Sequence, residues 1–156
     1  MISAFGLRMG YLPALRDLSK AASAEASRLL EAGDGQAAEA YAQASAQIAS
    51  KLSASGYSLL HHAVGTLMER DSLEAEKRIL AARGASEKVE EIDRRIEESR
   101  LRLEKYRKIA GAYLPALAQA PESEVSRFFD RIVREGEVST ALDLEVVREA
   151  MKEGGR

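Results

Sequence analysis

The sequence predicts an all-α protein: an antiparallel four-helix bundle or helical-hairpin array with a short helical C-terminal appendage. Ala, Leu, Glu, Arg and Lys dominate, and there are only 3 Pro and no Trp; such a composition favours helix. Glycine-containing turn signals also divide the chain into segments with helical periodicity. With 156 residues, the chain is long enough for one domain with a real core. We therefore expect a single domain over 1–156, with the main bundle at 11–119 and short helices within 121–153.

The first two helices are predicted at about 11–32 and 36–54, on either side of the turn Gly33-Asp34-Gly35. Apolar residues of the first helix follow the 3.6-residue period, at Leu15, Leu18, Ala22, Ala26 and Leu29. The second helix is unusually rich in alanine, at positions 37, 38, 40, 42, 44, 46 and 49. Small side chains let a neighbouring backbone come close, so this helix is predicted to pack tightly between the first and the third.

The third and fourth helices are predicted at about 58–83 and 86–119, separated by Gly84. Apolar positions in the fourth helix alternate in steps of three and four, which is a heptad pattern: Val89, Ile92, Ile96, Ser99, Leu103, Tyr106, Ala110, Tyr113 and Leu117. Its other face predicts four i,i+4 ion pairs: Glu90–Arg94, Glu91–Arg95, Glu98–Arg102 and Glu104–Lys108.

The heptad pattern has two interpretations. It packs against the third helix in an intramolecular antiparallel hairpin, or it forms an intermolecular coiled coil. The second interpretation makes an assembly face of Val89, Ile92, Ile96, Leu103, Tyr106 and Tyr113.

Two short helices complete the prediction, near 122–134 and 141–153. Pro121 suits the start of the first, Gly136 ends it, and Ser139 or Thr140 can cap the second. Phe128 lies on the apolar side of the first short helix. We expect it to dock this helix on the bundle; an exposed Phe128 would instead anchor a partner.

Composition excludes several classes of function. The net charge of -2 leaves no basic field for nucleic acid, and the absence of Cys excludes disulfides, thiolate metal sites and a cysteine nucleophile. The sequence has no phosphate-binding Walker loop, no glycine-rich dinucleotide turn and no GXSXG elbow. We therefore predict no enzyme activity and no cofactor. Cytoplasmic and bacterial extracytoplasmic (envelope) locations both fit this composition.

The apolar start, MISAFGLRMGYLPAL, contains one charged residue, Arg8. It lacks the basic n-region and long apolar core of a signal peptide. No apolar run in the sequence reaches the roughly 20 residues of a membrane-spanning helix. We expect this start to lead into the first helix and pack on the core; the other interpretation is the stub of a removed membrane or signal segment.

His61 and His62 are the only histidines. Neighbours on a helix point about 100° apart, so one metal ion rarely binds both. A glutamate three residues before either histidine, as in di-iron bundles, is missing. We expect one histidine at a helix interface and the other in solvent. The alternative is a small-molecule or metal-binding site that combines them with Glu69 and Tyr41.

An arginine cluster lies within the charge-dense part of the fourth helix: Arg94, Arg95, Arg100 and Arg102. Glutamates are interleaved with these arginines, which argues against nucleic acid and favours a solvated helix face. A phosphate or an acidic partner is the alternative ligand of this cluster.

The stretch ASRLLEAGDGQAAEAY resembles the helix–turn–helix junction of a tetratricopeptide-like repeat, at Ala26, Leu29, Gly33, Asp34 and Ala38. The match occurs once, Gly35 replaces the expected turn aromatic, and no copy follows 34 residues later. The resemblance implies a helical hairpin.

A longer region, from LRDLSKAASAEASRLLEAGDGQAAEAYAQ to SLLHHAVGTLMERDSL, resembles uncharacterised helical domains in the extracytoplasmic part of bacterial envelope proteins. That resemblance implies an all-helical architecture and leaves membrane attachment of a parent protein open.

These observations favour a non-catalytic helical module, of a bacterial protein, for protein–protein interaction or scaffolding. Its partner would be another protein or a second copy of the chain. Two alternatives remain: a small-molecule or metal-binding bundle, and a secretion or export chaperone.

Overall fold

The computed structural model describes residues 11–55 and 58–153, and all regular secondary structure in these ranges is helical. The all-α prediction is confirmed. The helices are α2 (Tyr11–Glu31), α3 (Gly35–Ser55), α4 (Leu59–Ala82), α5 (Ser86–Gln119), α6 (Glu122–Glu135), α7 (Glu137–Leu142) and α8 (Glu145–Glu153). Of the predicted start, positions 1–10 lie outside the described residues. None of the described helices combines the length and hydropathy needed to cross a membrane.

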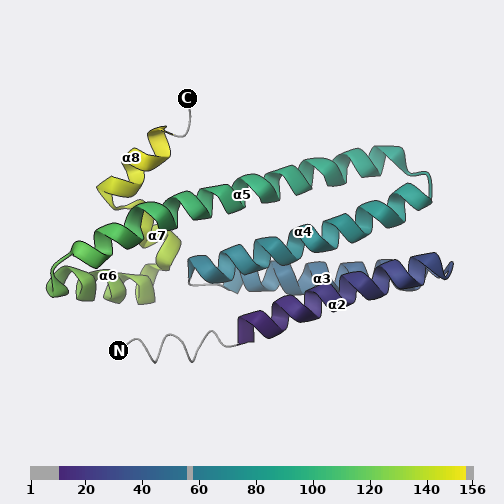
Figure 1. Cartoon of the computed structure of the whole chain (residues 1–156), viewed down its shortest axis with the longest axis horizontal. Helices are drawn as coiled ribbons and strands as arrows, with labels where there is room; N and C mark the ends of the chain where they lie inside the picture. The colour runs from purple at the N-terminus through teal and green to yellow at the C-terminus, as the bar shows by residue number, and fades with distance from the viewer. Residues whose placement is uncertain (1–10, 56–57, 154–156) are drawn as a thin grey trace.

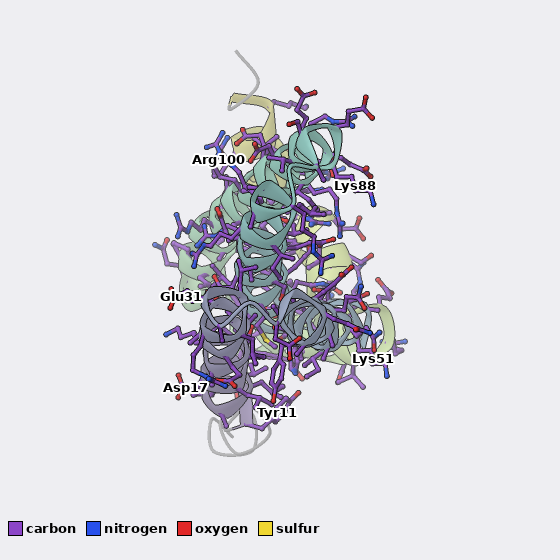
Figure 2. All side chains as sticks on the ribbon, turned by 90° about the vertical axis from the view of Figure 1, so that its right-hand side faces the viewer. Tyr11, Asp17, Glu31, Lys51, Lys88 and Arg100 are labelled. Carbon is purple, nitrogen blue, oxygen red and sulfur yellow. The ribbon has the colours of Figure 1, made fainter. Side chains whose placement is uncertain are left out.

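The four long helices run antiparallel, with α4 at the centre (Figure 1). Helices α2 and α3 pack on α4 and on each other, and α5 packs on α4. Figure 2 shows this stack end-on, with α5 and its Lys88 and Arg100 at one extreme, and α2 with Asp17 at the other. Helix α5 extends past the start of α4, and α6–α8 gather around that free end (Figure 1).

Glycines in the left-handed region end two of the long helices. Gly33 has a φ of 83° and Gly84 a φ of 72°, which side chains with a Cβ rarely adopt. After the first turn, an Asp34 carboxylate oxygen accepts the Ala37 backbone N–H at 3.0 Å and so caps α3. The predicted turns are thus produced by local chemistry.

The α2–α4 bundle buries small side chains, as predicted for the alanine-rich helix. Ala38, Ala42 and Ala49 of α3 are all buried. Where α4 crosses α3, a Cβ added to Gly65 would lie 2.2 Å from the Ser53 hydroxyl oxygen and 3.1 Å from the Ala49 carbonyl oxygen. A side chain on residue 65 would therefore force Ser53 or the two helices to shift.

The heptad face of α5 is used within the chain. Ile92, Ser99, Leu103 and Tyr113 are buried, and Val89, Ile96, Tyr106, Ala110 and Leu117 are half-buried. Beyond Leu103 the pattern missed one residue: Ile109, beside Ala110, is fully buried. The buried face therefore turns about the helix axis where α5 leaves α4 and meets α6–α8.

The ion pairs of α5 differ from the predicted i,i+4 set. Arg100 binds Glu97 and Glu104, while Arg102 reaches across to Glu69 of α4. The prediction considered one isolated helix face, whereas these side chains take the closest opposite charge, including charges on the neighbouring helix.

The last predicted helix is wrong in one respect. The helix expected at 141–153 corresponds to α8 and to only the last two residues of α7, and Ser139 and Thr140 lie inside α7 instead of capping α8. Helix α7 starts directly after Gly136, whose φ is 83°, and the Thr140 hydroxyl donates to the Gly136 carbonyl at 2.8 Å. A glycine that ends α6 therefore also begins the next helix.

A separate core holds the C-terminal helices to the end of α5. It consists of Leu59, Ile109, Tyr113, Phe128, Ile132, Ala141 and Val147. Phe128 is only 6% exposed, and its ring centroid lies 5.6 Å from that of Tyr113. The docking role expected for Phe128 thus agrees with its position, and the exposed alternative does not.

Candidate functional site

A groove runs over α4, between α3 and α5. Its volume is about 360 Å³, and its lining residues come from three helices: Ser50, Ser53 and Ala54 of α3, His62, Thr66 and Glu69 of α4, and Arg102 and Tyr106 of α5. The groove forms because α3 and α5 both pack on α4. Thr66 of α4 is buried and forms the floor of the groove.

Two opposite charges lie together in the groove. Arg102 Nη2 donates to Glu69 Oε2 at 2.5 Å and to the Ser99 hydroxyl oxygen at 3.0 Å. These bonds use only Arg102 Nη2 and Glu69 Oε2. Within the described residues, the remaining atoms Arg102 Nε, Arg102 Nη1 and Glu69 Oε1 have no hydrogen-bond partner. Each member of the ion pair thus keeps hydrogen-bonding capacity for a further group.

An aromatic pair forms another part of the groove lining. The rings of His62 and Tyr106 are 5.7 Å apart between centroids and tilted by 34°. This geometry is within the range of favourable aromatic contacts. The groove therefore places an aromatic surface near a charged one.

His61 points elsewhere. Its Nδ1 lies 2.7 Å from the Ser58 hydroxyl oxygen, and its Nε2 lies 2.5 Å from the Tyr11 hydroxyl oxygen. Burial, and then the neighbouring His62, lower the pKa of His61, while the Glu137 carboxylate acts in the opposite direction. The imidazole thus joins the start of α2 to the start of α4.

A third polar cluster lies at the start of α4. A Glu137 carboxylate oxygen accepts the Leu59 backbone N–H at 2.7 Å, and the other oxygen accepts the Tyr113 hydroxyl. Burial and the bond to Glu137 raise the pKa of Tyr113. The carboxylate occupies the positive end of the α4 dipole, so this cluster attaches α7 to the main bundle.

The structure brings together only part of the predicted site. His62 and Glu69 line the same groove, whereas His61 faces Tyr11. Tyr41 lies exposed on α3 outside the groove lining, and Phe128 is in the C-terminal core. The four-residue site of His61, His62, Glu69 and Tyr41 is therefore not assembled.

Sequence reasoning assigned the other main groove residues to different roles. Tyr106 was expected in the heptad face and Arg102 in the arginine cluster. Arg102 and Tyr106 are four residues apart in the sequence, which places both on one side of α5. This spacing is the signal that could have assigned them to one site. Glu137 had no such signal, because its partner Leu59 is 78 residues away.

The residues described by the structure include no group of three or more His, Asp or Glu side chains placed to hold a metal ion. His62 and Glu69 in the groove are accompanied by a positive guanidinium, which disfavours a cation there.

Comparisons with protein-family models, curated proteins and solved structures found no match for this chain.

Proposed function

We propose that the chain is a non-catalytic protein–protein interaction module that presents the outer face of α6 to another polypeptide. The observation that carries this proposal is the exposure of apolar side chains there. Val133 is 74% exposed and Phe129 is 42% exposed. Large apolar side chains gathered in solvent mark sites of association.

Exposed Phe129 and Val133 and half-buried Val125 share one side of α6. Val125, Phe129 and Val133 are spaced four residues apart, so they lie above one another along the helix. We call these three residues the α6 stripe. Adjacent to it, Phe128 and Ile132 are buried in the C-terminal core. The α6 stripe is thus held on a helix that is already anchored, which lowers the entropy cost of binding.

A partner with an apolar helix face of its own would suit the α6 stripe, because amphipathic helices recognise one another through anchors at this spacing. A second copy of the chain is one such partner, and a different helical protein is another. Both follow from the same surface and can be separated by experiment.

Self-association is tested by light scattering on a sizing column over a range of protein concentrations. If the partner is a second copy, the wild-type chain forms a dimer that Val133→Glu converts to monomer. Leu101→Glu is the matched control, because Leu101 is also exposed, at 50%, but lies on α5. The control should leave the dimer intact.

A heterologous partner is tested by photo-crosslinking in cells of the natural host. A photoreactive residue at position 133 should give a defined adduct that the same residue at position 101 does not give. A chain that is monomeric at every concentration and shows no adduct specific to position 133 would refute the proposal.

A further inference from the structure

The groove between α3 and α5 combines features of a small-molecule site. Its volume of about 360 Å³ lies at the lower end of the roughly 300–1,000 Å³ typical of ligand pockets. Three helices supply its lining. A small ligand would therefore touch α3, α4 and α5 at once.

The charges of the lining indicate which ligand would fit. Among the described residues that line the groove, only Arg102 and Glu69 carry a fixed charge, and the two charges are opposite in sign. An anion alone would meet the glutamate, and a cation alone would meet the guanidinium. A molecule that carries both charges satisfies both residues.

The unused hydrogen-bonding capacity agrees with this choice. The existing ion pair joins one nitrogen to one oxygen, which leaves Arg102 Nε and Nη1 for a carboxylate and Glu69 Oε1 for an ammonium group. Charge-assisted bonds of this kind are the strong ones in proteins. The ring pair of His62 and Tyr106, 5.7 Å between centroids, offers a surface for the apolar part of the same molecule.

We propose that this groove binds a small zwitterion of the α-amino acid class. Its carboxylate binds Arg102, its ammonium group binds Glu69, and its side chain lies against His62 and Tyr106. None of the α6 stripe residues lines the groove, so this site is independent of the proposed interaction surface.

Nuclear magnetic resonance tests the proposal directly, because the chain has only 2 His and each gives its own imidazole signal. The full chain is titrated with L-phenylalanine, and with glycine as the minimal zwitterion. We expect a saturable shift of the His62 signal and little change at His61, which faces Tyr11. The variant His62→Gln assigns the two signals.

Derivatives of the probe test each charge separately. N-acetylphenylalanine lacks the ammonium group and phenylalaninamide lacks the carboxylate. Each should bind about tenfold more weakly than phenylalanine, the effect expected for one lost charge-assisted bond. Equal binding of either derivative would overturn the zwitterion assignment.

Variants of the chain complete the test. Arg102→Gln and Glu69→Gln should each weaken phenylalanine binding by about tenfold. Arg94→Gln, on an exposed part of α5 outside the groove, should leave phenylalanine binding unchanged. Circular dichroism is used to check that all three variants are folded. No saturable shift with either probe, or the same affinity in Arg102→Gln, overturns the proposal.

Discussion

The two ends of the molecule bury apolar surface in different ways. In the α2–α4 bundle, α3 contributes Ala38, Ala42 and Ala49 to the core, and Gly65 lets α4 approach α3. The C-terminal core is built from large side chains such as Ile109, Phe128 and Val147. The α2–α4 bundle also buries Leu12, Leu52, Met68 and Ile79, so its distinguishing feature is the small residues that let α3 lie close to its neighbours.

Helices α7 and α8 have only 6 and 9 residues. Isolated helices of this length are unstable in water, and tertiary packing must hold them. A few large side chains in the C-terminal core therefore stabilise helices α6–α8, which we call the C-terminal unit. The α2–α4 bundle combines large side chains with a close approach of α3 and α4 at Gly65, and substitutions should separate these two ways of packing.

The largest effect is expected from Ile109→Ala. Ile109 is 0% exposed and belongs to the C-terminal core, and truncation of a buried isoleucine costs about 2–5 kcal/mol. Urea denaturation measures the free energy of unfolding. Ile96→Ala, at a half-buried position of the same helix, is the control and should cost less. An equal cost for both variants would mean that the C-terminal core is no tighter than the α4–α5 contact.

The opposite change, from small to larger, should harm the α2–α4 bundle. In Gly65→Ala the new methyl group would meet the Ser53 backbone nitrogen at 3.0 Å as well as its hydroxyl, and overpacking costs about 1–3 kcal/mol. Gly111→Ala on α5 is the matched control, because nothing lies within 4 Å of its added Cβ. The control should gain up to about 1 kcal/mol from helix propensity.

The two glycine variants are compared by their midpoints of thermal unfolding. We expect the midpoint to fall for Gly65→Ala and to rise for Gly111→Ala. Similar stabilisation of both would show that α3 and α4 can separate at residue 65 without cost.

A smaller and local effect is expected from Glu137→Gln, where α7 meets the start of α4. The change replaces the charged acceptor of the Leu59 N–H and the Tyr113 hydroxyl with a neutral amide. Hydrogen bonds to a charged group contribute about 1.5–3 kcal/mol and neutral ones about 0.5–1.5 kcal/mol, so the expected cost is about 1 kcal/mol. Amide hydrogen exchange should become faster at Leu59 and in α7, but not in α2 or α3. The control is Glu145→Gln on the exposed face of α8. Uniformly faster exchange in all helices would argue that the chain unfolds as one unit.

The smallest expected effect is a pH dependence at His61. Its pKa in the folded chain is below the ordinary value of 6.5, so the unfolded chain takes up a proton first as the pH falls. Stability should therefore decrease as the pH is lowered from above 6.5 towards the folded-state pKa. Urea midpoints at pH 7.5 and pH 6.0 measure this decrease. It should be smaller in His61→Gln than in the wild type, and an unchanged decrease would assign it to other groups.

Local signals explain why most helix boundaries could be predicted. Gly33, Gly84 and Gly136 all have positive φ, and each marks the end of a helix that the sequence already indicated. The division between α7 and α8 was missed because Ser139 and Thr140 look like caps in a one-dimensional reading. Their side chains instead lie within a helix that begins after Gly136.

The candidate site was less predictable, because it depends on which helices become neighbours. His62 and Glu69 share α4, so their common groove follows from helical spacing. Arg102 joins them only because α5 packs on α4, and Leu59 meets Glu137 across 78 residues. Contacts of this kind leave no periodic trace in a single sequence.

The length of α5 has a consequence for how this chain can change during evolution. Its 34 residues span about 51 Å. Helix α5 packs on α4 and contributes Ile109 and Tyr113 to the C-terminal core. One residue inserted between Leu103 and Ile109 would rotate helices α6–α8 by about 100° around the α5 axis and shift them by about 1.5 Å along it. Glu137 would then lose Leu59. We expect insertions to be tolerated at the turns and rejected within this part of α5, because its length and helical phase fix the position and orientation of α6–α8 relative to α4.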